Sequence, residues 1–165
     1  MTTQNSSIES SSTITLPEPL ILERILNAPR DLVFKAWTDQ IEMAQWWGPR
    51  YFTNPVCELD VRPGGAILIH MQGPDGTVFP MEGEFLEVTP VERIVMATTA
   101  LDSLGGNPLL EEITTVTFEE HDGKTKLTVH ARITNAVPEA AGALAGMEEG
   151  WNQTLDKLVE FVAAA

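Results

Sequence analysis

The sequence predicts an α+β domain in which an antiparallel sheet of seven strands curves around a long C-terminal helix. Two observations carry this prediction. Apolar and polar residues alternate with a period of two through most of residues 52–135, and an apolar stripe with helical spacing follows Pro138. The length of 165 residues is typical of one domain, and 43% hydrophobic residues is enough to form a core.

The first elements are expected to be one strand and two short helices. Residues 20–26 have the composition of a strand. Pro29 fits the first position of a helix, where a backbone N–H is not needed. Asp39, or Thr38 before it, can cap a second short helix, and Gly48-Pro49 ends that helix.

Six further strands follow, separated by turn residues. They are expected over residues 52–61, 66–72, 78–88, 93–101, 111–120 and 125–135. Residues 73–76 (Gly-Pro-Asp-Gly) and 121–124 (His-Asp-Gly-Lys) are typical of hairpin turns. Pro80 marks an edge position or a bulge, because proline cannot donate to a sheet.

The last segment is predicted to be one long helix over residues 138–164, about 40 Å in length. Gly142, Gly146 and Gly150 recur beside its apolar stripe. Two interpretations stay open. These glycines either leave space between helix and sheet, or they mark a partly non-helical start near residues 138–146.

Charge and composition exclude several classes of function. The chain has 24 acidic and 10 basic side chains and a net charge of -14, which disfavours nucleic acid and anionic membranes as partners. No segment has the length and apolar character of a membrane span or a signal peptide. We expect a cytoplasmic protein with a disordered polar tail over residues 1–17 and one domain over residues 18–165.

Five motifs occur in an order that is familiar from a known family. They are Trp46-Trp47-Gly48-Pro49, CELDVRPGG at 57–65, GPDG at 73–76, GEFLEVTPVERIV at 83–95, and Gly150-Trp151. Over about residues 18–163 the chain resembles the homologues of the activator of the 90-kDa heat-shock-protein ATPase, which belong to the START-like, birch-pollen-allergen-like superfamily. The resemblance implies a helix-grip fold with a cavity between the sheet and the C-terminal helix.

Alternation along the strands, together with that fold, suggests which residues line such a cavity. The candidates are Trp46, Ile69, Met71, Met81, Met96, Thr98, Glu112, Thr114, Met147 and Trp151. Methionine suits adaptable apolar surfaces, and the two threonines with Glu112 are expected at a wet end of the cavity. Ordinary core packing is the alternative for the methionines and tryptophans.

Motifs for metal binding and for known catalytic chemistry are not found in the sequence. His70, His121 and His130 lack the spacing of metal ligands, and Cys57 is a lone thiol expected to be structural. We therefore expect no metal and no cofactor. Glu82 and Glu84 are expected on one face of their strand and Glu87 on the other, as part of a solvated acidic rim.

Three functions are compatible with this sequence. The first is binding of a small hydrophobic or amphipathic ligand in the cavity, without catalysis. The second is an enzyme that uses the same cavity, as cyclases and lyases of the superfamily do, with Glu112 as its acid or base. The third is regulation of a chaperone ATPase through the protein surface. A chaperone or a second copy of the chain is accordingly a candidate partner.

Overall fold

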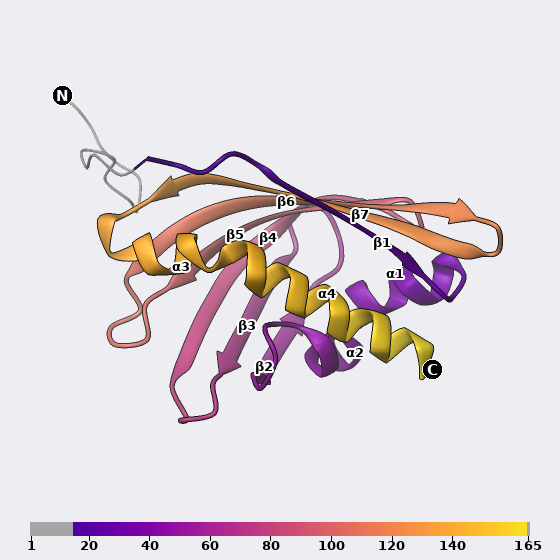
Figure 1. Cartoon of the computed structure of the whole chain (residues 1–165). Coiled ribbons are helices and arrows are strands. Elements are labelled where there is room, and N and C mark those ends of the chain that lie inside the picture. The colour runs from indigo at the N-terminus through magenta and orange to yellow at the C-terminus, as the bar shows by residue number, and fades with distance from the viewer. Residues whose placement is uncertain (1–14, 165) are drawn as a thin grey trace.

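A seven-stranded antiparallel sheet with its helices on one face forms the computed structural model, which describes residues 15–164 (Figure 1). The strand order is β1-β7-β6-β5-β4-β3-β2, so that β1 and β2 are the two edges. We call the face covered by helices the inner face and the opposite face the outer face. The predicted fold class is confirmed, whereas most of the predicted tail over residues 1–17 lies outside the described residues.

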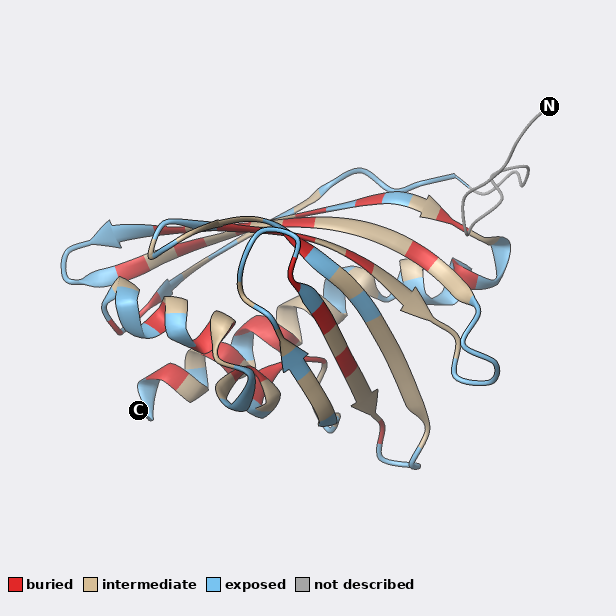
Figure 2. Ribbon diagram, turned by 180° about the vertical axis from the view of Figure 1, so that it is seen from behind, coloured by how far each residue is buried: buried red, intermediate tan, exposed pale blue. Residues whose placement is uncertain are grey.

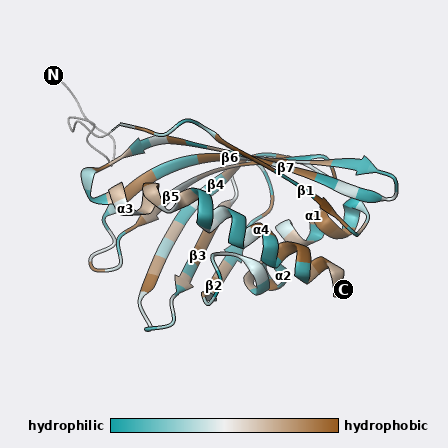
Figure 3. Ribbon diagram, viewed as in Figure 1, coloured by the Kyte–Doolittle hydropathy of each residue, from teal (hydrophilic) through white to brown (hydrophobic). Residues whose placement is uncertain are grey.

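The elements follow the predicted order. The strands are β1 (Leu20–Leu26), β2 (Thr53–Leu59), β3 (Ala66–Gln72), β4 (Val78–Thr89), β5 (Arg93–Leu101), β6 (Pro108–His121) and β7 (Lys124–Ala136). The helices are α1 (Arg30–Thr38), α2 (Gln40–Trp46), the 3-10 turn η1 (Pro138–Ala140), α3 (Ala141–Ala145) and α4 (Met147–Ala163). The strands show alternating hydrophobic and hydrophilic residues, as the period of two requires (Figure 3).

The start of each short helix has a local cause. Pro29 is the residue before α1 rather than its first helical residue, and its extended backbone sets the entry angle. Asp39 caps α2, since its side chain accepts hydrogen bonds from the N–H groups of Ile41 and Glu42.

A bulge in β4 changes the face that Glu87 occupies. Between Phe85 and Glu87 the register with β5 shifts, and Leu86 is left as the extra residue. Glu87 therefore shares the outer face with the earlier glutamates of β4 and pairs with Arg93 at 3.1 Å. The prediction that Glu87 lies on the other face is wrong, because simple alternation assumes a strand without bulges.

The C-terminal segment is not one continuous helix. It begins as η1 and α3, and α4 starts only after Gly146. Gly142 and Gly146 are exposed, and a Cβ added at Gly142 would meet no atom within 4 Å. The glycines at 142 and 146 therefore open no space toward the sheet, and the interpretation as a partly non-helical start is the one the structure supports. Gly150 lies closer to its surroundings, with Pro49 at 3.7 Å from the position of its Cβ.

Helices α1, α2 and the C-terminal half of α4 lie together at one end of the molecule (Figure 1). Four tryptophans of these helices and of the residue after α2 pack against one another. We call Trp37, Trp46, Trp47 and Trp151 the tryptophan cluster. Ring centroids lie 4.7 Å apart for Trp37 and Trp46, and 5.7 Å apart for Trp47 and Trp151. Trp46 is fully buried, and its Nε1 donates to the Ala36 carbonyl at 3.0 Å. Buried residues concentrate here and along the sheet-facing side of α4 (Figure 2).

Lys157 ties α4 to the loop that follows α2. Its Nζ donates to the carbonyl oxygens of Gly48 at 3.1 Å and Pro49 at 3.2 Å, and Trp47 O lies at 3.5 Å. Burial lowers the pKa of Lys157. The loop is thereby held against the C-terminal half of α4 by charge-assisted hydrogen bonds that satisfy the carbonyl groups of the loop.

No helix of the described chain has the length and hydrophobicity needed to cross a membrane.

Removal of Trp37 should destabilise the fold more than removal of any exposed apolar side chain. Trp37 is fully buried, and its ring lies edge-to-face on those of two tryptophans and Phe118. We expect Trp37→Ala to lower the free energy of unfolding by about 3–5 kcal/mol, measured by chemical denaturation. Leu104→Ala is the control, because Leu104 is 97% exposed. Equal stability of the two variants would contradict this description of the core.

Two glycine substitutions should have opposite effects. A Cβ at Gly83 would lie 2.0 Å from the Ala97 carbonyl oxygen, so Gly83→Ala must displace β5 and should destabilise by roughly 1–3 kcal/mol. Gly142→Ala meets open space inside a helix and should stabilise by up to about 1 kcal/mol. Thermal unfolding of both variants tests this, and a neutral Gly83→Ala would show that β4 and β5 are not this close.

Candidate functional site

Polar side chains interrupt the apolar inner face of the sheet. On one side lies the larger cluster, which includes the tryptophan cluster and residues of all seven strands, among them Phe85 and Met96. On the other side is a smaller cluster formed by Leu110, Ile133, Ala136 and Ala140, with Leu144 and Met147 packed against it. Thr98, Glu112 and Thr114, which we call the polar belt, occupy the boundary between the two clusters.

The cross-strand register builds this belt. Thr98 of β5 lies opposite Glu112 of β6, which in turn lies opposite Ile133 of β7. On the other side of Thr98 stands Gly83 of β4, which has no side chain to fill the inner face. Within this row, Thr98 and Glu112 therefore interrupt a line of side chains that is apolar on both sides, with Ile67 of β3 at one end and Ile133 of β7 at the other.

Glu112 is the ionisable residue of the belt, and it accepts hydrogen bonds from two neighbouring side chains. Trp151 Nε1 of α4 donates to Glu112 Oε2 at 3.3 Å, and Thr114 contributes a second hydrogen bond. Thr98 and Thr114 are 7% and 2% exposed, while Glu112 is half-buried. Burial raises the pKa of Glu112, and the hydrogen bonds from Trp151 and Thr114 oppose this rise without cancelling it.

The candidate residues from the sequence fall into three groups. Thr98, Glu112, Thr114 and Trp151 come together at the belt. Ile69, Met71, Met81 and Met96 pack in or against the larger cluster, and Met147 against the smaller one. Trp46 does not reach the belt, because its ring is fully buried among Trp37 and Trp47 and its N–H is satisfied by Ala36. The structure thus places Trp46 in the core, as the alternative held.

Sequence reasoning missed two small residues at the site. Gly83 stands in the row of the belt, and Ala100 lies on the inner face beside Met81 and Leu110. Alternation with Phe85 and Met81 places Gly83 on the inner face. Which residues of β3 and β5 lie opposite Gly83 depends on how the strands are paired, and the sequence of β4 alone does not determine that pairing.

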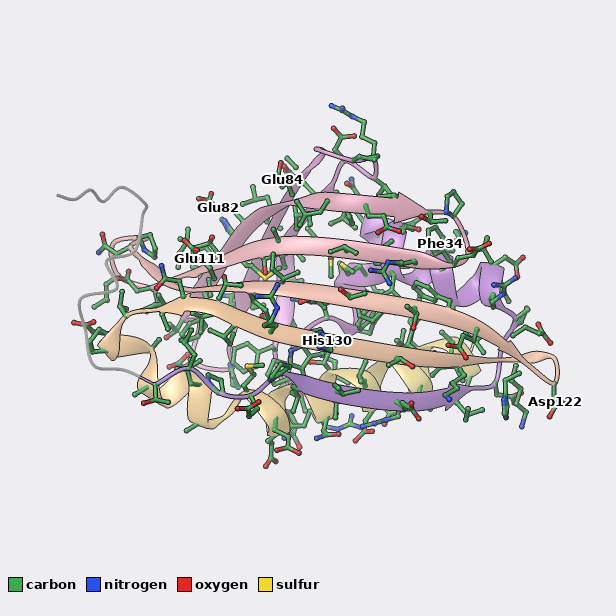
Figure 4. All side chains as sticks on the ribbon, turned by 90° about the horizontal axis from the view of Figure 1, so that it is seen from above. Phe34, Glu82, Glu84, Glu111, Asp122 and His130 are labelled. Atoms are coloured by element: carbon green, nitrogen blue, oxygen red, sulfur yellow. The ribbon has the colours of Figure 1, made fainter. Side chains whose placement is uncertain are left out.

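The surface has two hollows, and the first of them also borders Thr98 and Glu112 of the belt. One of about 630 Å³ is on the outer face, lined mainly by outward residues that include Glu82, Glu84 and Glu111. Figure 4 looks down on this face, where the three glutamates and His130 are labelled. The other, of about 530 Å³, lies beside Arg50, Tyr51 and the end of α4.

The histidines and the cysteine take no part in the belt. His121 is exposed in the β6–β7 turn, and His70 and His130 are partly exposed on the outer face. Burial raises the pKa of the Cys57 thiol to about 11, which keeps it protonated at neutral pH. Within residues 15–164, no cluster of His, Cys, Asp or Glu is arranged to hold a metal ion.

The titration of Glu112 should be visible in the stability of the fold. Its folded-state pKa is raised, so the stability it contributes is greatest in acid and falls as pH rises from the ordinary carboxyl range through the raised value. Glu112→Gln keeps an acceptor for Trp151 and cannot ionise. We expect the variant to melt above wild type at neutral pH, with the difference disappearing in acid.

Glu84→Gln is the matched control, since it removes one carboxylate from an exposed outer position. It should not reproduce the pH-dependent gain. A Glu112→Gln variant that is less stable than wild type at neutral pH would show that the ionised carboxylate stabilises the belt.

Comparison with known proteins agrees with this architecture. Solved structures from Nitrosomonas europaea and Chromobacterium violaceum are 27% and 28% identical, with TM-scores of 0.72 and 0.71. They align with 88% and 87% of this chain and with 94% and 96% of their own chains. An AHSA1 protein from Silicibacter pomeroyi shares the fold at 23% identity and a TM-score of 0.74, covering 89% of this chain and 99% of its own.

No curated protein matches the chain. The model of one protein family does, and it covers residues 27–163, which include every strand except the first and all of the helices. The helix-grip architecture, the family motifs and this match lead to one conclusion: the chain belongs to the family of activator of Hsp90 ATPase homolog 1-like proteins.

Proposed function

We propose that this protein binds a small hydrophobic or amphipathic molecule between the inner face of the sheet and helix α4. The observation that carries the proposal is the polar belt of Thr98, Glu112 and Thr114 between two apolar clusters. An apolar surface with a few convergent polar groups is the usual composition of a small-molecule site. The fold agrees with this, since helix-grip proteins commonly hold a ligand-binding cavity at this place.

Partial exposure of inward side chains supports access to the site. Met71, Met81 and Met147 point toward the core clusters yet are only half-buried, as is Trp151. The flexible thioethers can rearrange around an apolar guest at low energy. Access to the belt therefore requires side-chain movement rather than unfolding of the sheet.

Catalysis in the same cavity is the second candidate, and one observation favours it. A carboxyl whose pKa is raised by an apolar setting is suited to general acid chemistry. Within the described chain, however, the belt offers Glu112 without a second ionisable partner, and acid–base reactions generally use two groups. Binding without turnover needs fewer assumptions.

Regulation of a chaperone ATPase is suggested by the description of the family. It would act through a surface, and the outer hollow with its carboxylates is the place on this chain most suited to a basic partner. Replacing one alanine on each face of β5 by a larger residue distinguishes binding at the inner face from binding at the outer hollow.

The test is binding of an apolar fluorescent probe to two matched variants. Ala100→Phe adds volume on the inner face beside Met81, and Ala97→Phe adds the same volume on the outer face. We expect wild type and Ala97→Phe to bind about one probe per chain and Ala100→Phe to bind at least about tenfold more weakly. Circular dichroism and thermal unfolding confirm that both variants are folded.

The reverse pattern would overturn the proposal. If Ala97→Phe removes binding and Ala100→Phe keeps it, the outer hollow is the binding site. If wild type binds no probe, the inner face is ordinary core and the partner-binding function gains support.

A further inference from the structure

We infer that the ligand has an apolar body and one hydrogen-bond-donating head group, an alcohol or an amine, which Glu112 accepts, and that Glu112 selects against anionic heads such as carboxylates. This inference rests on the function proposed above and specifies the ligand class of that site. It follows from the hydrogen-bonding capacity of Glu112, from the charges around it, and from the character of the apolar surface beside it.

Glu112 retains capacity for further donors. In its ionised form, the carboxylate of Glu112 offers about four acceptor positions on its two oxygens. The described protein donors to it are Trp151 Nε1, at 3.3 Å, and the Thr114 hydroxyl. Positions are therefore left that a hydroxyl or an ammonium group of a ligand can occupy, and a ligand without a donor would leave them unsatisfied.

The inner face supplies no counter-ion for an anionic head. Within the described residues, the inward positions around Glu112 on β3 to β7 carry no lysine, arginine or histidine. Charged side chains of β4, β6 and β7 near this row, namely Glu82, Glu84, Glu111 and Arg132, belong to the outer face. On the α4 side, Glu148 and Glu149 are exposed and acidic.

Three basic residues, Arg24, Arg50 and Lys157, lie on or against α4, and each is engaged with groups other than Glu112; Arg50 pairs with Glu160. The backbone of Arg24 on β1 lies opposite Leu127, six residues along β7 from Ile133, or roughly 20 Å from the row of Glu112, and its side chain extends to α4. It donates to Asn152 at 2.8 Å and pairs with Asp156 at 3.4 Å. Lys157 is held by the carbonyl groups after α2. A carboxylate head group beside ionised Glu112 would thus meet repulsion that no inward cation of the described residues offsets.

The apolar part of the site discriminates less than the polar part. Met81, Met96 and Met147 supply unbranched, flexible side chains in the two clusters that border the belt, and Met71 adds another farther along β3. Surfaces of this kind adapt to guests of different shape. Selection among ligands must then come mainly from the head group, which is where Glu112 acts.

The test compares three probes with one ten-carbon chain: decanol, decylamine and decanoic acid. Each is titrated below its aggregation concentration into wild type, Glu112→Gln and the charge-matched control Glu84→Gln, and binding is followed by calorimetry. For wild type we expect decanol and decylamine to bind at least about tenfold more tightly than decanoate. For Glu112→Gln we expect decylamine to lose about tenfold and decanoate to approach decanol. Glu84→Gln should behave as wild type.

Each outcome separates this inference from the function on which it rests. Decanoate that binds wild type as tightly as decanol, with binding still removed by Ala100→Phe, overturns the selection by Glu112 and leaves the proposed function intact. A loss of discrimination in Glu84→Gln equal to that in Glu112→Gln overturns it as well, because net charge then explains the effect. Failure of all three probes to bind wild type overturns both.

Discussion

A mismatch in width between one helix and its sheet is the constraint on which the rest of this structure depends. Seven strands about 4.8 Å apart make a sheet roughly 29 Å across, whereas a helix with side chains is about 10 Å in diameter. Helix α4 therefore covers only part of the inner face. The remaining apolar surface must be covered by other elements, by curvature of the sheet, or by a bound molecule.

The chain meets this constraint differently at its two ends. Helices α1 and α2 bring three tryptophans beneath the sheet, and Lys157 fastens the following loop to the C-terminal half of α4. At the other end η1 and α3 contribute only Ala140 and Leu144 to the core, and Gly146 separates them from α4. The end with α1 and α2 supplies large side chains and has a dense core. The end with η1 and α3 supplies little side-chain volume, and the polar belt lies toward that end.

Much of this could be predicted from the sequence, and the misses have identifiable causes. A period of two, with Gly76 and Gly123 in turns of positive φ, defines the strands because those signals are local. The partly non-helical start near residues 138–146 is one of two interpretations that the glycines leave open, whereas the bulge at Leu86 leaves no mark in the period of two and is missed. The contact of Trp151 with Glu112 joins residues 39 positions apart, so its geometry required the three-dimensional register.

Glu112 occupies an inward position at which a carboxyl group does not favour folding. A half-buried carboxyl with neutral hydrogen-bond donors and no basic partner within the described chain disfavours the folded state at neutral pH. Glutamine would fit the same position without that penalty, and an apolar residue would join the two clusters into one core. An inward carboxyl that packing does not require points to a role for that side chain beyond packing.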